Sequence, residues 1–89
     1  MDNNEYLPIG TVVLLKGAEK DKELMIIGYN AKVKTEDGEV FAEYMACPHP
    51  YGIKGMDYIR FFNRDNIDKI IDMGYVDEDF TKLKGMLQG

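Results

Sequence analysis

The sequence is poor in cysteine and histidine and has no long apolar run. Cys47 is the single cysteine, so no disulfide can form within the chain, which fits a reducing, cytosolic compartment. No apolar run approaches the roughly 20 residues of a membrane helix. Residues 1–5 also lack the charged and then apolar pattern of a signal peptide. We therefore expect a cytoplasmic protein that does not enter a membrane.

Positive charge is also scarce, with eleven basic against sixteen acidic side chains and a formal net charge of −5. Nucleic-acid binding needs a clustered basic surface, and the basic residues here are scattered, so we expect no nucleic-acid partner. The 89 residues leave room for one domain, and 45% apolar content is that of a globular protein. We expect one domain over 1–89: a flexible N-terminus at 1–5, a β-barrel at 6–76 and a C-terminal helix at 77–88.

The stretch from Thr11 to Tyr29 predicts a β-hairpin. Two apolar runs rich in β-branched residues, Thr11–Lys16 and Glu23–Tyr29, flank a polar loop that contains Gly17. Successive side chains of a strand point to opposite faces, so both faces of this hairpin are apolar. Each face must therefore be covered by the closing strands of a barrel, by a helix, or by another protein.

Further strands follow this hairpin. Gly28 marks a bulge or tight bend, the chain stays extended over 31–35, and Asp37-Gly38 is a strong hairpin signal. We expect strands from Val40 to about Cys47 and over 58–62, then a helical turn at 64–68 and a strand at 69–75.

The C-terminal helix is the clearest element. Asp77 can cap it, and Phe80, Leu83 and Leu87 form one apolar stripe. Together these elements predict an α+β, mainly β fold: a small antiparallel SH3-like barrel of about five strands with a C-terminal helix. An open sheet with two helices is the alternative.

Cys47 and His49 are the obvious pair for chemistry, as a thiol nucleophile with its base or as two zinc ligands. A zinc site needs three or four protein ligands, however, and the chain holds one cysteine and one histidine. We interpret Cys47 as a small buried residue at a strand end and His49 as a loop residue. The acidic residues at 77–79 suit a helix start, and the glycines form no phosphate loop. We expect no catalytic residue, no metal, no other cofactor and no enzyme.

Aromatic side chains gather around the proline-rich loop 47–52. Rigid aromatic rings beside prolines are typical of protein-recognition surfaces. One of the two neighbouring phenylalanines must face the core, since they cannot both point inward from one strand, and the other is expected to be exposed with Tyr51. The predicted partner-binding residues are Tyr44, Pro48, His49, Pro50, Tyr51, Tyr58, Phe61 and Phe62.

Several motifs resemble a known family, and they occur in one order: Tyr6–Gly17, Met25–Gly28, Cys47–Gly52, Phe61-Phe62-Asn63 and Gly74-Tyr75. This pattern is similar to a family of small proteins of unknown function in Gram-positive bacteria, whose genes lie beside LXG toxins of the type VII secretion system. The resemblance implies no catalysis and transfers no catalytic residue. It implies a cytosolic chaperone or targeting factor that binds the helical N-terminal region of an LXG toxin.

The leading expectation is thus a non-enzymatic protein that holds a partner toxin by a helix in a groove or a segment added to a strand edge. The alternative is a homo-oligomeric structural or regulatory module, such as a homodimer, whose spare apolar face is covered by its own copy. A thiol or metal enzyme that uses Cys47 and His49 is the weakest hypothesis.

Overall fold

The computed structural model describes residues 5–88, with the side chain of residue 88 left out, and contains one sheet and one α-helix. The predicted flexibility of the N-terminus falls almost entirely on residues 1–4, which lie outside the described residues. In chain order the elements are β1 (Val12–Leu15), β2 (Leu24–Thr35), β3 (Gly38–Pro48), the short 3-10 helix η1 (Met56–Tyr58), β4 (Arg60–Phe62), the 3-10 helix η2 (Arg64–Asn66), β5 (Ile67–Asp72) and α1 (Glu78–Gln88).

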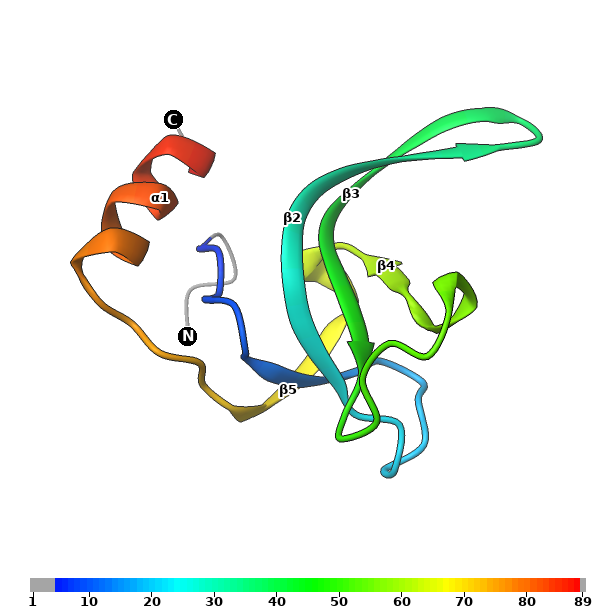
Figure 1. Cartoon of the computed structure of the whole chain (residues 1–89), viewed down its shortest axis with the longest axis horizontal. Helices are drawn as coiled ribbons and strands as arrows, with labels where there is room; N and C mark the ends of the chain where they lie inside the picture. The colour runs from blue at the N-terminus through cyan, green and yellow to red at the C-terminus, as the bar shows by residue number, and fades with distance from the viewer. Residues whose placement is uncertain (1–4, 89) are drawn as a thin grey trace.

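The five strands form one antiparallel sheet in the order β4-β3-β2-β1-β5. The long strands β2 and β3 bend strongly, so that the sheet curls around a core, while α1 stands at one side (Figure 1). A 3-10 helix precedes the last strand, as the sequence predicted. The predicted α+β, mainly β fold with a small barrel-like sheet and a C-terminal helix is therefore confirmed.

The predicted extended segment and the Asp-Gly turn belong to one long hairpin made by β2 and β3. Thr35 pairs with Gly38 at its tip, and Gly38 adopts a φ of 122° that favours glycine. The register shifts between Ile26 and Gly28, which confirms the predicted bulge. The bulge helps the long strands to bend around the core.

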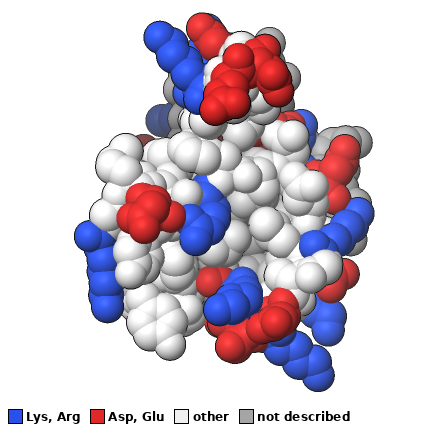
Figure 2. Space-filling view, turned by 90° about the vertical axis from the view of Figure 1, so that its right-hand side faces the viewer, with Lys and Arg blue, Asp and Glu red and all other residues white. Residues whose placement is uncertain are grey.

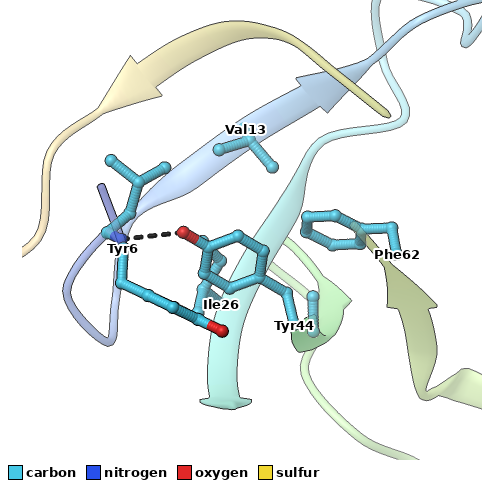
Figure 3. Packing of buried hydrophobic residues seen from close by; sticks show 7 residues of the cluster. Tyr6, Val13, Ile26, Tyr44 and Phe62 are labelled. Atoms are coloured by element: carbon cyan, nitrogen blue, oxygen red, sulfur yellow. Dashed lines mark hydrogen bonds between the residues drawn. The ribbon is translucent and has the colours of Figure 1, made fainter. Parts of the chain in front are cut away.

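The core encloses the first hairpin within this one chain. Val13, Ile26 and Tyr44 are fully buried, and Figure 3 shows them packed with Tyr6 and Phe62. Side chains on the other face of β1 are buried as well, at 5% exposure for Val12 and 8% for Leu14. This chain itself covers most of both faces of the first hairpin. The expectation that a partner is needed to cover one of these faces is therefore wrong.

Three element boundaries differ from those predicted. Tyr58 belongs to η1, and its strand begins only at Arg60. The helical turn ends at Asn66, whose side-chain oxygen accepts a hydrogen bond from the Asn63 N–H at 2.8 Å and so closes the turn early. The following strand then occupies 67–72 instead of 69–75. It ends before Gly74, whose N–H donates to the Thr11 hydroxyl oxygen at 3.0 Å.

The C-terminal helix was predicted almost to the residue. The Asp77 carboxylate accepts a hydrogen bond from the Phe80 N–H at 2.9 Å, so Asp77 is the N-cap. Leu87 packs against the core cluster, and Lys84 forms an ion pair of 3.6 Å with Glu5.

Candidate protein-binding site

A pocket of about 540 Å³ opens between the loop that joins β1 to β2 and the loop that joins β3 to β4. Leu15 and Leu24 form part of its wall, and both also pack against the core cluster. The pocket is thus an opening of the core at one end of the barrel-like sheet. We call it the mouth pocket; its remaining lining residues are Ala18, Asp21, Lys22, Glu23, Pro48, His49, Tyr51, Tyr58 and Arg60.

Backbone hydrogen bonds hold the two loops in place. The His49 N–H donates to the Glu23 carbonyl oxygen at 3.0 Å and ties one loop to the other. The Gly52 N–H donates to the Pro48 carbonyl oxygen at 2.8 Å, in a turn where Gly52 has a φ of 76°. The Arg60 guanidinium donates to the Asp57 carbonyl oxygen. The pocket walls are therefore positioned before any partner arrives.

The mouth pocket brings together four of the eight predicted partner-binding residues: Pro48, His49, Tyr51 and Tyr58. Pro50 is exposed in the same loop. Phe61 is 43% exposed and Phe62 is 5% exposed, which confirms that one phenylalanine faces the core.

Two of the predicted residues cannot contact a partner. Tyr44 has no exposed surface, and Phe62 is buried beside it with 5.4 Å between the ring centres. Tyr44 and Phe62 pair across β3 and β4 and point into the core, so we remove both from the predicted surface. The other six residues remain a prediction.

The cysteine and histidine are separated by their environments. Cys47 is 2% exposed, whereas His49 is exposed in the loop, as predicted for a buried strand-end residue and a loop residue. Within residues 5–88, no group of three or more His, Cys, Asp or Glu side chains could hold a metal ion.

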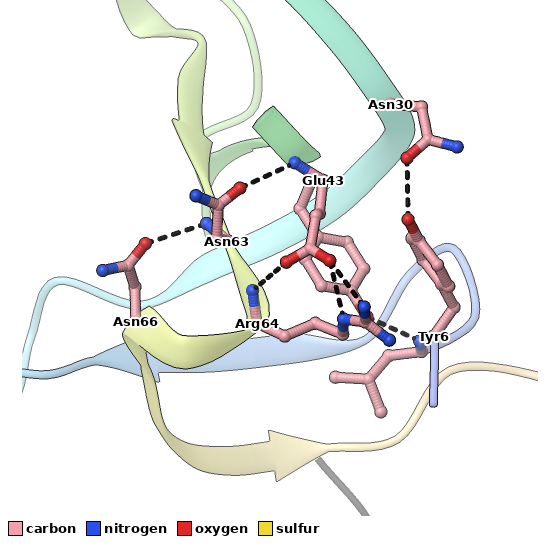
Figure 4. Close-up of polar contacts among 8 residues, drawn as sticks. Tyr6, Asn30, Glu43, Asn63, Arg64 and Asn66 are labelled. Atoms are coloured by element: carbon pink, nitrogen blue, oxygen red, sulfur yellow. Dashed lines mark hydrogen bonds and ion pairs between the residues drawn. The ribbon is translucent and has the colours of Figure 1, made fainter. Parts of the chain in front are cut away.

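A polar cluster that the sequence did not reveal surrounds the point where the long hairpin leaves the barrel (Figure 4). The Arg64 guanidinium lies 2.6 Å from the Glu43 carboxylate and 4.8 Å from the centre of the Tyr6 ring. The Tyr6 hydroxyl donates to the Asn30 side chain at 2.7 Å, and the Glu43 N–H donates to the Asn63 side chain at 2.9 Å. We call these five residues the collar.

Burial raises the pKa of Glu43, but hydrogen bonds and the positive charge of Arg64 outweigh it and hold this pKa below its usual value. Glu43 and Arg64 are 21 residues apart in the sequence, so no local sequence pattern predicts their ion pair.

The N-terminal segment is held by two tyrosines. Tyr44 accepts a hydrogen bond from the Leu7 N–H at 2.8 Å, and the Tyr29 hydroxyl donates to the Leu7 carbonyl oxygen at 2.5 Å. Burial is the main reason that the pKa values of Tyr29 and Tyr44 are raised to about 12. These hydroxyls therefore fasten the chain entry to the core and stay protonated at neutral pH.

Most exposed apolar side chains lie away from the first hairpin. Val40 and Phe41 are 53% and 54% exposed on β3, and Phe61 follows on β4. Figure 2 shows a broad uncharged surface below the charged end of the long hairpin. Val40 and Phe41 are consecutive residues of β3, so they lie on opposite faces of that strand.

The fold and the site define a small protein with a barrel-like sheet, a pre-formed pocket that combines apolar and aromatic residues with charged ones, and exposed apolar strand residues. A family described as a domain of unknown function, DUF4176, matches residues 6–83, so the chain belongs to the DUF4176 family. Comparisons with curated proteins and with solved structures found no match. The helices within residues 5–88 are too short or too polar to cross a membrane.

Proposed function

We propose that this protein is a non-enzymatic, cytoplasmic accessory protein that binds another protein. The partner is the helical N-terminal region of an LXG toxin, which the protein accompanies as a chaperone or targeting factor of type VII secretion. The resemblance of the sequence motifs supplies the identity of this partner. The observation that carries the binding role is the mouth pocket, since it gathers Pro48, His49, Tyr51 and Tyr58 beside apolar walls.

The chemistry of the mouth pocket suits a protein segment. Tyr51 is 68% exposed, and a rigid aromatic ring buries a large area at low cost in conformational entropy. Asp21, Lys22, Glu23 and Arg60 place charges of both signs around the apolar wall. An apolar centre with a polar rim is the usual anatomy of a protein–protein interface.

Co-expression with an LXG toxin of a type VII secretion system, the proposed partner, followed by size-exclusion chromatography, tests the proposal. We expect one complex to elute, and separate elution of two well-folded proteins would contradict the proposed function. The variant Tyr51→Ser should weaken the complex by about tenfold, a loss of about 1.4 kcal/mol. Tyr75→Ser is the matched control, because Tyr75 is 80% exposed and lies outside the mouth pocket.

Self-association is the second candidate function, and the outer face of the sheet favours it. Met45 pairs with Phe61, and Phe41 lies on the same face of β3, so two exposed phenylalanines share one surface. Light scattering on the pure protein distinguishes the two functions. A stable dimer that Phe41→Ser dissociates would favour the homo-oligomeric module, whereas a monomer would remove it.

A further inference from the structure

The outer half of the long hairpin projects from the barrel as an arm, which we define as residues 31–42. β1 pairs with β2 only at Leu24 and Met25, and β4 pairs with β3 only over 44–46. Within residues 5–88, the two strands of the arm therefore pair with each other and with no further strand. Figure 1 shows the arm extending well beyond the rest of the molecule.

The strand register gives the arm two different faces. Ala31 pairs with Ala42 and Val33 pairs with Val40, so one face carries four small apolar side chains. The opposite face carries the pairs Lys32–Phe41 and Lys34–Glu39. The apolar face continues the core-facing row of β3, because it lies on the same side as the buried Tyr44, yet Val40 is 53% exposed.

The base of the arm is fixed by the collar. Asn30, the residue before the arm, has a φ of 52°, which turns the strand, and its side chain accepts the hydrogen bond from Tyr6. On the other strand, Glu43 is held by Arg64 through its carboxylate and by Asn63 through its N–H. An arm set in one direction is pre-organised, so a partner loses little affinity to the cost of ordering it.

We propose that the apolar face of the arm is a docking surface for an amphipathic helix of the partner, an inference that rests on the proposed function. Ala42 is buried at the base of the arm, so the accessible part of this face consists of Ala31, Val33 and the 53% exposed Val40. The contact uses a sheet face, not the edge that an added strand needs. Glu36 and Asp37 lie in the turn at the tip, where their negative charges favour a helix with basic residues beside its apolar stripe. A second copy is disfavoured, because it carries the same net charge of −5.

Calorimetric titration of the purified protein with the helical N-terminal region of the LXG toxin used for co-expression tests this inference. The double variant Val33→Thr, Val40→Thr keeps the β-branched shape of both residues and makes the face polar. We expect it to raise Kd by about tenfold or more. Val76→Thr makes the same change at a valine that is 55% exposed and lies outside the arm, and it should change Kd by less than about threefold.

A double variant, Glu36→Gln and Asp37→Asn, tests the charges without touching the apolar face. It should weaken binding and reduce the dependence of Kd on ionic strength, because the tip then attracts fewer basic residues. Unchanged binding by both the valine and the tip variants, each folded by circular dichroism, would overturn the docking surface. If Tyr51→Ser still weakened that binding, the proposed function would stand; a wild-type protein that binds no toxin would refute both.

Discussion

Replacing Tyr44 by phenylalanine tests how the chain entry is fastened to the core. The substitution removes one oxygen atom and leaves the aromatic ring, which packs 5.4 Å from the Phe62 ring centre. The lost oxygen is the acceptor for the Leu7 N–H at 2.8 Å, and the dashed line that ends on the Tyr44 hydroxyl in Figure 3 marks this hydrogen bond. Both residues are buried, with 0% and 6% exposure, so bulk water has little access to the donor that is left behind.

The magnitude follows from this unpaired donor. A buried N–H without a partner costs about 1–3 kcal/mol, against a total stability of about 5–15 kcal/mol for a domain of ordinary stability. Each kcal/mol lowers Tm by about 4–8 °C in a domain of this size. We therefore expect Tyr44→Phe to lower Tm by about 4–24 °C. The hydrogen bond from Tyr29 to the Leu7 carbonyl oxygen remains and keeps the segment partly attached.

Thermal and urea unfolding, followed by far-ultraviolet circular dichroism, measure this change. Tyr51→Phe is the matched control, because the same oxygen is removed from a ring that is 68% exposed, and its stability should stay within about 0.5 kcal/mol of the wild type. Equal stabilities of the two variants would refute the reasoning that the hydroxyl of Tyr44 satisfies a buried backbone donor.

Three further predictions concern pH and packing. Because the pKa values of Tyr29 and Tyr44 are raised to about 12, the folded state keeps protons that the unfolded chain loses near pH 10. The free energy of unfolding should therefore fall between pH 10 and 12, and it should fall less steeply when both residues are replaced by phenylalanine. The pKa of Glu43 is lower in the folded chain than its unfolded value of about 4.5, so the ionised carboxylate stabilises the fold above that pH. This stabilisation should be lost as the pH falls through the folded pKa, and Glu43→Gln should not show that loss. Gly74→Ala should lower Tm more than Gly28→Ala. The Cβ of an alanine at 74 would lie 2.4 Å from the Ile9 carbonyl oxygen, whereas that of an alanine at 28 would lie 2.9 Å from the flexible Met45 Cε.

Local sequence signals predicted the fold well wherever the structure obeys local rules. The Asp37-Gly38 turn, the Gly28 bulge and the Asp77 cap each depend on residues close in the chain, and each lies where predicted. The boundaries around 64–75 depend instead on distant contacts, such as the hydrogen bond between Gly74 and Thr11. Alternating and helical patterns overlap in that segment, so tertiary contacts, and not the periodicity of the sequence, determine where its elements begin and end.

The candidate site was only partly predictable for the same reason. Prolines and aromatic residues near one another in sequence pointed to the loop that lines the mouth pocket. Alternation along β3 did not say which face is inward, so Tyr44 was assigned to the surface although it is the centre of the core. The collar joins residues from four segments of the chain, and no sequence spacing could have paired Glu43 with Arg64 or Tyr6 with Asn30.

Enclosure of the first hairpin changes what a partner is needed for. Since Val13, Ile26 and Tyr44 are fully buried by this chain alone, folding does not require a partner that covers them. The pure protein should therefore unfold in urea in one cooperative transition, with a slope of about 1–3 kcal/mol/M. Under the proposed function, a toxin region that binds only the folded state should add about 2.7 kcal/mol to that stability when present at about 100 times its Kd. A pure protein with no cooperative transition, which gains one only when the toxin region is added, would contradict the self-sufficient core and indicate folding coupled to binding.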